Sequence, residues 1–175
     1  MKSFTVLFLL GFFSLAAFSQ PHHFPQSWVG DWNGELSWYQ GANPVPKKVK
    51  MELRIHPTDS SHKFSWQIIY GSATEDNRPY TLIAVDTAKG HWVIDENNGI
   101  VLDQYMIAAK FCGAFTVQNS TIINNYWLEE GKLHIEFYNI SAKPVATTGK
   151  DTKESPSVNS YQVKTYQKAI LERSK

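Results

Sequence analysis

Two amide side chains stand on apolar faces of predicted strands, and their chemistry is suited to orienting a ligand. Gln104 shares its face with Leu102 and Met106, and Asn124 shares its face with Tyr126. A buried amide without a hydrogen-bond partner costs about 1–3 kcal/mol, so something must satisfy both groups. A neighbouring side chain or an ordered water is one solution, and a bound ligand is the other.

Aromatic side chains indicate where such a ligand would lie. The chain holds six Trp, eight Tyr and ten Phe, and aromatic rings both suit strands and line small-molecule pockets. With the two amides, the aromatic and apolar residues on the inward strand faces predict a ligand-binding interior. The predicted lining residues are Trp66, Gln104, Met106, Phe115, Asn124, Tyr126 and Phe137.

Carboxylates gather around two predicted turns. Asp86 and Glu96 border turns that contain glycine, and Asp103 alternates against the apolar face of its strand, so turn formation and solvation explain them without catalysis. The sequence has no Ser/His/Asp arrangement, phosphate loop or Cys/His motif. We therefore predict no catalytic residue. An enzyme at the barrel mouth stays an alternative, which would need two carboxylates or a His–acid pair beside the cavity.

The six histidines do not have the spacing of a metal site. His56 and His62 flank a turn, and His91 and His134 are predicted to point outward from their strands. We predict no metal ligand. Cys112 is the only cysteine, so no disulfide forms within the chain, and its apolar neighbours predict a small buried side chain.

Short segments of alternating apolar and polar residues must position these side chains. In the clearest of them, Val49 to Ile55, apolar residues alternate with charged ones, as in a strand with one face in water. Turns ending in Gly90 and Gly99 separate later segments, and the last strand would close the sheet against the first. The predicted fold is all-β, an antiparallel up-and-down meander closed into a barrel of about nine or ten strands.

The chain begins with the pattern of an export signal. A positive start precedes an apolar run from Phe4 to Phe18, so residues 1–20 are predicted as a signal peptide and the mature protein as secreted or periplasmic. A membrane anchor competes, but this run has about fourteen residues against the roughly twenty that span a bilayer, and no cysteine follows to carry a lipid. Residues 21–26 form a lead-in, residues 27–171 the barrel, and residues 141–157 a mobile polar loop.

Charge indicates no macromolecular partner. The 17 basic and 16 acidic side chains are interspersed, and Lys47, Lys48 and Lys50 are offset by Glu52. Such a surface predicts no binding of nucleic acid. The expected partner is a small hydrophobic or amphipathic ligand, and no membrane span is expected.

The first strand carries a known signature. Gly30-Asp31-Trp32 resembles the Gly-x-Trp opening of lipocalins and the wider calycin superfamily. The resemblance implies that Gly30 and Trp32 close one end of the barrel, and that Trp32 packs under a basic side chain from near the C-terminus, for which Arg173 is available. It also implies carriage of small, mostly apolar molecules. The helix before the last strand and the disulfide of true lipocalins are not evident, so the chain resembles a bacterial-style lipocalin-like domain.

Another barrel family with the same opening, the nitrobindin-like haem barrels, holds haem through a histidine near the C-terminus. The last strand here, from Ser160 to Tyr166, has no histidine, and the nearest is His134 on the preceding strand. This departure disfavours haem. We expect no cofactor.

A protein-interaction or inhibitor module is the remaining alternative. In that case the barrel interior would be filled, and exposed aromatic side chains would contact a partner protein. The candidates for such a surface are Trp38, Tyr39, Trp92 and Trp127. A hollow interior would therefore support the ligand-binding hypothesis, and a filled interior would support the protein-interaction hypothesis.

Overall fold

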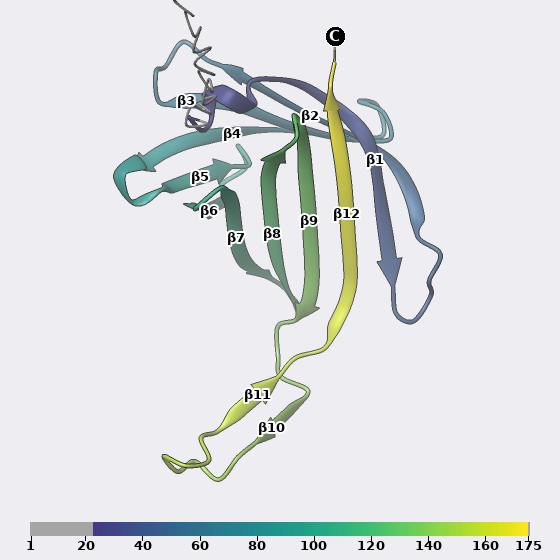
Figure 1. Ribbon diagram of the computed structural model, residues 1–175, viewed down its shortest axis with the longest axis vertical. Coiled ribbons are helices and arrows are strands. Elements are labelled where there is room, and N and C mark those ends of the chain that lie inside the picture. Colours follow the sequence, from purple (N-terminus) through teal and green to yellow (C-terminus); the bar gives the residue numbers. More distant parts are fainter. Residues whose placement is uncertain (1–22, 175) are drawn as a thin grey trace, which may run out of the picture.

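The chain forms a closed antiparallel barrel of ten strands (Figure 1). These are β1 (Gly30–Gln40), β2 (Lys47–Pro57), β3 (Lys63–Tyr70), β4 (Asp76–Asp86), β5 (His91–Asp95), β6 (Val101–Ile107), β7 (Lys110–Val117), β8 (Ser120–Glu129), β9 (Lys132–Ser141) and β12 (Val163–Arg173). Sequential strands pair from β1 to β9, and β12 closes the barrel between β9 and β1. The predicted all-β meander is confirmed, with ten strands.

The computed structural model describes residues 23–174. The predicted signal peptide, residues 1–20, lies outside this part of the chain. Besides strands, the described part holds two short 3₁₀ helices, η1 (Gln26–Trp28) and η2 (Thr87–Lys89). Between residues 23 and 174, no helix has the length and apolar character needed to cross a membrane.

Alternation along each strand decides which side chains face inward. In β2, Met51, Leu53 and Ile55 are fully buried, while the charged residues between them remain on the outer face. The inward face of β4 is not evident from its sequence, because both of its faces are apolar. In the structure Leu82 is fully buried, so the face that carries Leu82 points inward.

One end of the barrel is closed by the segment before β1. Trp28 is 2% exposed, and the ring of Phe24 lies 4.9 Å from that of Trp28, 5.1 Å from that of Trp92 and 4.6 Å from that of Phe111. These rings pack against one another at this end of the barrel.

Trp32 and Arg173 join the first and last strands at this closed end. The Nε1 of the buried Trp32 donates to the carbonyl oxygen of Trp28 at 2.8 Å. The Arg173 guanidinium lies 4.2 Å from the centroid of the Trp32 ring and donates to the carbonyl oxygen of Ser27 at 2.9 Å. A Cβ on Gly30 would lie 2.7 Å from Nη1 of Arg173, so the glycine makes room for this contact.

The shortest ladder in the barrel wall joins β6 and β7. Only three residue pairs join these strands in the described chain, Tyr105 with Cys112, Met106 with Phe111 and Ile107 with Lys110. By contrast, β7 pairs with β8 along its whole length. The stretch of β6 from Val101 to Gln104 therefore has no ladder to β7.

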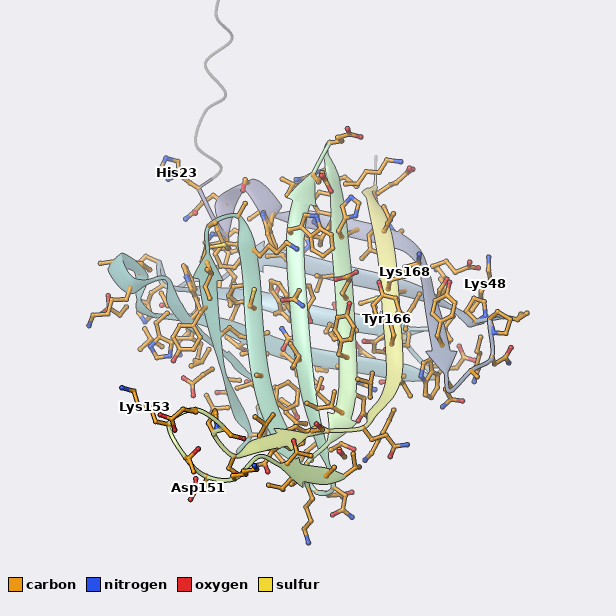
Figure 2. All side chains as sticks on the ribbon, turned by 60° about the horizontal axis from the view of Figure 1, so that its bottom comes forward. His23, Lys48, Asp151, Lys153, Tyr166 and Lys168 are labelled. Carbon is orange, nitrogen blue, oxygen red and sulfur yellow. The ribbon has the colours of Figure 1, made fainter. Side chains whose placement is uncertain are left out.

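The connection between β9 and β12 leaves the barrel as a small hairpin. Its strands β10 (Ala146–Thr148) and β11 (Val158–Ser160) pair at the end of the barrel opposite the C-terminus (Figure 1). Asp151 and Lys153 project from the turn between them (Figure 2). This hairpin includes most of the stretch 141–157, so the structure places a short sheet where the sequence predicts a loop, and the mobility of the stretch stays a prediction.

Candidate functional site

The interior holds a cavity of about 180 Å³ toward the end where the β10–β11 hairpin leaves the barrel. Its walls come from β3 to β9 and from β12, because the closed sheet brings the inward faces of these strands together. Six of the seven residues predicted from sequence line this one cavity: Trp66, Gln104, Phe115, Asn124, Tyr126 and Phe137.

Met106 is the exception. It follows Gln104 on the same face of β6, but it lies beside Phe24, Trp28 and Trp92 in a hollow near the closed end. Two residues along a strand advance the chain by about 7 Å. That step places Met106 on the far side of the buried aromatic rings from the cavity. Gln104 and Met106 therefore share a strand face but do not line the same cavity.

Gln104 and Asn124 satisfy each other. Asn124 Nδ2 donates to Gln104 Oε1 at 2.7 Å, and Gln104 Nε2 donates to Asn124 Oδ1 at 3.4 Å. The two residues are 1% and 3% exposed. From the sequence, the hydrogen-bond partner of each amide could be a neighbouring side chain, an ordered water or a ligand. In the structure it is the neighbouring side chain.

Gly113 makes this amide pair possible. It stands opposite Asn124 on β7, between the two strands that carry the amides. A Cβ at this position would lie 2.5 Å from Cδ of Gln104, so the amide passes over the glycine to reach β8. A glycine inside a strand often marks a place where another group comes close to the backbone. The sequence shows that Gly113 is such a glycine, but it does not identify Gln104 as the group that comes close.

Two buried polar atoms on the cavity wall have no hydrogen-bond partner among the described residues. They are Oδ1 of Asn139 and Nε1 of Trp66; the Trp66 residue is 0% exposed, and its Nε1 lies near the Tyr126 hydroxyl without the geometry of a hydrogen bond. A third such atom, Nε1 of Trp38, borders an adjoining hollow that shares Tyr70 and Arg78 with the cavity. Buried polar groups are nearly always paired in native proteins, so the expected partner of these atoms is a water molecule or a ligand. Sequence analysis missed Asn139, because one amide near a strand end resembles many solvated ones.

Aromatic side chains form much of the wall. The ring of Trp66 lies 5.2 Å from that of Tyr126, edge to face, and Tyr126 lies 5.8 Å from Phe137. Burial raises the pKa of Tyr126, and it raises the pKa of Tyr70 to about 12. Both hydroxyls are therefore uncharged at neutral pH, and neither adds a charge to the cavity.

Charged side chains lie at the mouth. Arg78 donates from Nε and Nη2 to the two carboxylate oxygens of Asp76, each at 2.8 Å, and its guanidinium lies 4.8 Å from the centroid of the Tyr70 ring. These hydrogen bonds lower the pKa of Asp76 and raise that of Arg78. Glu96 also lines the cavity, and its Oε2 accepts from Asn98 at 3.3 Å. Sequence analysis missed Arg78, which stands in a polar stretch without clear alternation.

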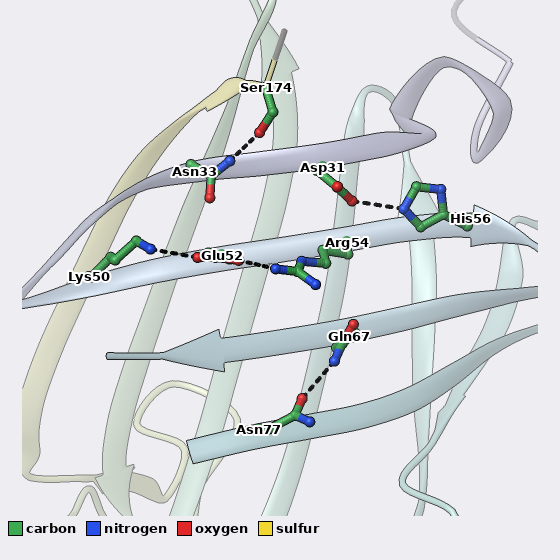
Figure 3. A network of polar contacts seen from close by, with 9 residues as sticks. All are labelled: Asp31, Asn33, Lys50, Glu52, Arg54, His56, Gln67, Asn77 and Ser174. Atoms are coloured by element: carbon green, nitrogen blue, oxygen red, sulfur yellow. Dashed lines mark hydrogen bonds and ion pairs between the residues drawn. The ribbon is translucent and has the colours of Figure 1, made fainter. Parts of the chain in front are cut away.

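The His–acid pairs lie on the outer surface. His91 Nε2 is 2.7 Å from Asp103, and His56 Nε2 is 2.7 Å from Asp31 within a polar network on the outer face of β1 and β2 (Figure 3). His134 stacks on Trp127 outside the barrel, with ring centroids 5.0 Å apart. None of these histidines lines the cavity. Within residues 23–174, no group of three His, Cys, Asp or Glu side chains is arranged to hold a metal ion.

The aromatic residues considered for a protein-binding surface are mostly engaged. Trp92 is 5% exposed, so its expected exposure is wrong; it alternates inward with Ile94 and packs under Phe24. Tyr39 stacks on Tyr166 at 5.9 Å.

Trp127 and Cys112 occupy the outer face of the sheet. Trp127 lies under Lys110, whose Nζ is 4.4 Å from the ring centroid. Cys112, predicted as a buried side chain, is only half-buried, because Phe111 and Gly113 take the inward positions of β7. The sequence identified the apolar stretch correctly but not the face of the cysteine.

Comparison with known proteins supports the fold alone. No protein-family model and no curated protein matches this chain. Among solved structures, the chain is similar to a protein of unknown function from the DUF3598 family of Nostoc punctiforme PCC 73102, with a TM-score of 0.59 and 12% identity. The match covers 83% of this chain and 47% of that one, so this chain spans about half the length of its structural neighbour. The match therefore shows a shared barrel fold and no family for this chain.

Proposed function

We propose that this protein is a lipocalin-like carrier that binds a small hydrophobic or amphipathic molecule inside the barrel. The observation that carries the proposal is a pair of polar atoms on the wall of an aromatic cavity, Trp66 Nε1 and Asn139 Oδ1, that make no hydrogen bond of acceptable geometry within residues 23–174. A ligand with one acceptor and one donor would satisfy both atoms. The predicted signal peptide leads us to propose that binding takes place outside the cytoplasm.

The volume of the cavity limits the ligand. A cavity of about 180 Å³ is several times the roughly 30 Å³ that a water molecule occupies in the liquid, and it is below the roughly 300 Å³ at which drug-sized pockets begin. A flat body of one or two rings suits this space. A long lipid chain does not.

The Gln104–Asn124 pair has a supporting part in this proposal. Each amide already has its partner, so neither requires a ligand. Their polar atoms form part of a wall that is otherwise mostly apolar, and they hold β6 and β8 together beside the cavity. Their role is therefore to position the wall.

Titration calorimetry with 2-naphthalenemethanol tests the proposal. Its two fused rings suit the cavity, and its hydroxyl both donates and accepts. The Ile122→Phe variant fills the cavity, since Ile122 lines it, whereas Ile123→Phe adds the same group to the next residue, which faces outward on β8. We expect binding to the wild type and to Ile123→Phe, and at least about a tenfold loss in folded Ile122→Phe. Absent binding, or equal binding by the two variants, would contradict the proposal.

A further inference from the structure

The mouth of the cavity carries an unbalanced negative charge. Arg78 and Glu96 are the charged side chains among the described residues that line it. The guanidinium of Arg78 is held by both carboxylate oxygens of Asp76. Glu96 has no cationic partner among the described residues and accepts only a 3.3 Å hydrogen bond from the Asn98 amide. One negative charge therefore remains at the mouth.

No lysine between residues 23 and 174 lines the cavity, so none cancels that charge from inside it. Lys164 donates to the carbonyl oxygen of Asn119 at 2.7 Å and to Ser120 Oγ at 3.0 Å. Lys47 lies 5.9 Å from the ring centroid of Trp38. Neither lysine lines the cavity, and both already have a contact elsewhere.

The uncharged groups of the mouth also favour a cation. The unpartnered Oδ1 of Asn139 is an acceptor, and an ammonium group supplies three N–H donors. The rings of Tyr70 and Tyr80 line the cavity, and the faces of aromatic rings attract cations. The guanidinium of Arg78 already lies over Tyr70, which leaves Tyr80 for a ligand.

We propose that the cavity selects amphipathic organic cations, with the apolar body inside the barrel and an ammonium group at the mouth beside Glu96 and Asn139. This inference rests on the proposed function, because it concerns the same cavity. At the mouth the ammonium keeps part of its hydration, which avoids the large cost of burying a charge in the deep part. A carboxylate in the same position faces Glu96 and gains no free cation.

Three ligands with one shared body test this inference. They are 2-naphthylmethylamine, 2-naphthalenemethanol and 2-naphthoic acid, which are cationic, neutral and anionic at neutral pH. Dissociation constants are measured by calorimetry at low ionic strength. We expect the amine to bind about two- to fivefold more tightly than the alcohol and the acid to bind more weakly than the alcohol by a similar factor, the range of partly exposed charge pairs. Added salt should shrink both differences.

The Glu96→Gln variant tests whether the Glu96 carboxylate causes the tighter binding of the amine. It keeps the size and hydrogen-bonding capacity of the side chain and removes the charge, so the advantage of the amine over the alcohol should disappear. Asp95→Asn is the matched control, since it removes the same charge from a neighbouring residue that does not line the cavity, and the wild-type order should persist. Tightest binding of the acid, or an unchanged order in Glu96→Gln, would overturn the inference while ligand binding itself stands. Failure of all three ligands to bind would overturn the proposed function as well.

Discussion

Gln104 on β6 and Asn124 on β8 are joined by a reciprocal amide pair that passes over Gly113 on the strand between them. The pair lies where the ladder between β6 and β7 begins, since Tyr105, the residue after Gln104, is the first residue of β6 paired with β7. It therefore supplies a side-chain link across a part of the wall that lacks backbone hydrogen bonds.

Gly113→Ala should destabilise the barrel. The added Cβ would lie 2.5 Å from Cδ of Gln104, so the amide must leave its partner, and both amides then become unpaired. We expect the free energy of unfolding to fall by about 1–3 kcal/mol, measured by urea denaturation. Ala114→Ser, at the next and exposed position of β7, is the control and should change little. A variant as stable as the wild type would show that the amide pair tolerates the methyl group.

Replacing one amide should cost more than replacing both. Gln104→Leu leaves Asn124 buried without a partner, at a cost of about 1–3 kcal/mol, and Asn124→Leu does the same to Gln104. The double variant removes both polar groups, so it should recover most of this loss. A double-mutant cycle by chemical denaturation measures the coupling. Additive losses would mean that the two amides do not depend on each other.

Arg173→Met should loosen the closed end. The substitution keeps an unbranched side chain over Trp32 but removes the cation–π contact and the hydrogen bond to the Ser27 carbonyl. We expect a loss of about 1–2 kcal/mol, together with a change in the near-UV circular dichroism of the tryptophans. Lys168→Met removes a positive charge from the outer face of the same strand (Figure 2) and is the control. Equal thermal stability of the two variants would contradict the role of Arg173.

Acid should remove the contribution of the Asp76–Arg78 pair. The guanidinium lowers the pKa of Asp76 below its ordinary value of 3.8, so the folded state favours the ionised carboxylate. The stabilisation is therefore complete above that ordinary value and disappears as the pH falls through the folded pKa. Asp76→Asn should be less stable than the wild type at about pH 7, and the difference should shrink toward about pH 3. The exposed Asp59→Asn is the control, and a difference that does not change with pH would contradict the assignment.

The faces of the strands could be predicted because their signal is local. In β2, Met51, Leu53 and Ile55 alternate with charged residues, and a strand turns successive side chains to opposite sides. The same rule placed Gln104 and Asn124 inward. It also turns Trp92 inward, opposite the outward His91, so Trp92 is not available for the surface that the protein-interaction hypothesis needs. The sequence does not show that Phe24, far away in the chain, packs against Trp92.

The sequence by itself determined an all-β barrel and six of the residues that line its cavity, since alternation and turn composition are properties of neighbouring residues. Only the tertiary structure decided that Gln104 pairs with Asn124, that Met106 lies outside the cavity, and that Arg78 and Asn139 lie on its wall. These relationships depend on the register and tilt of strands as they close into a barrel. Residues distant in the chain fix both, and no local pattern records them.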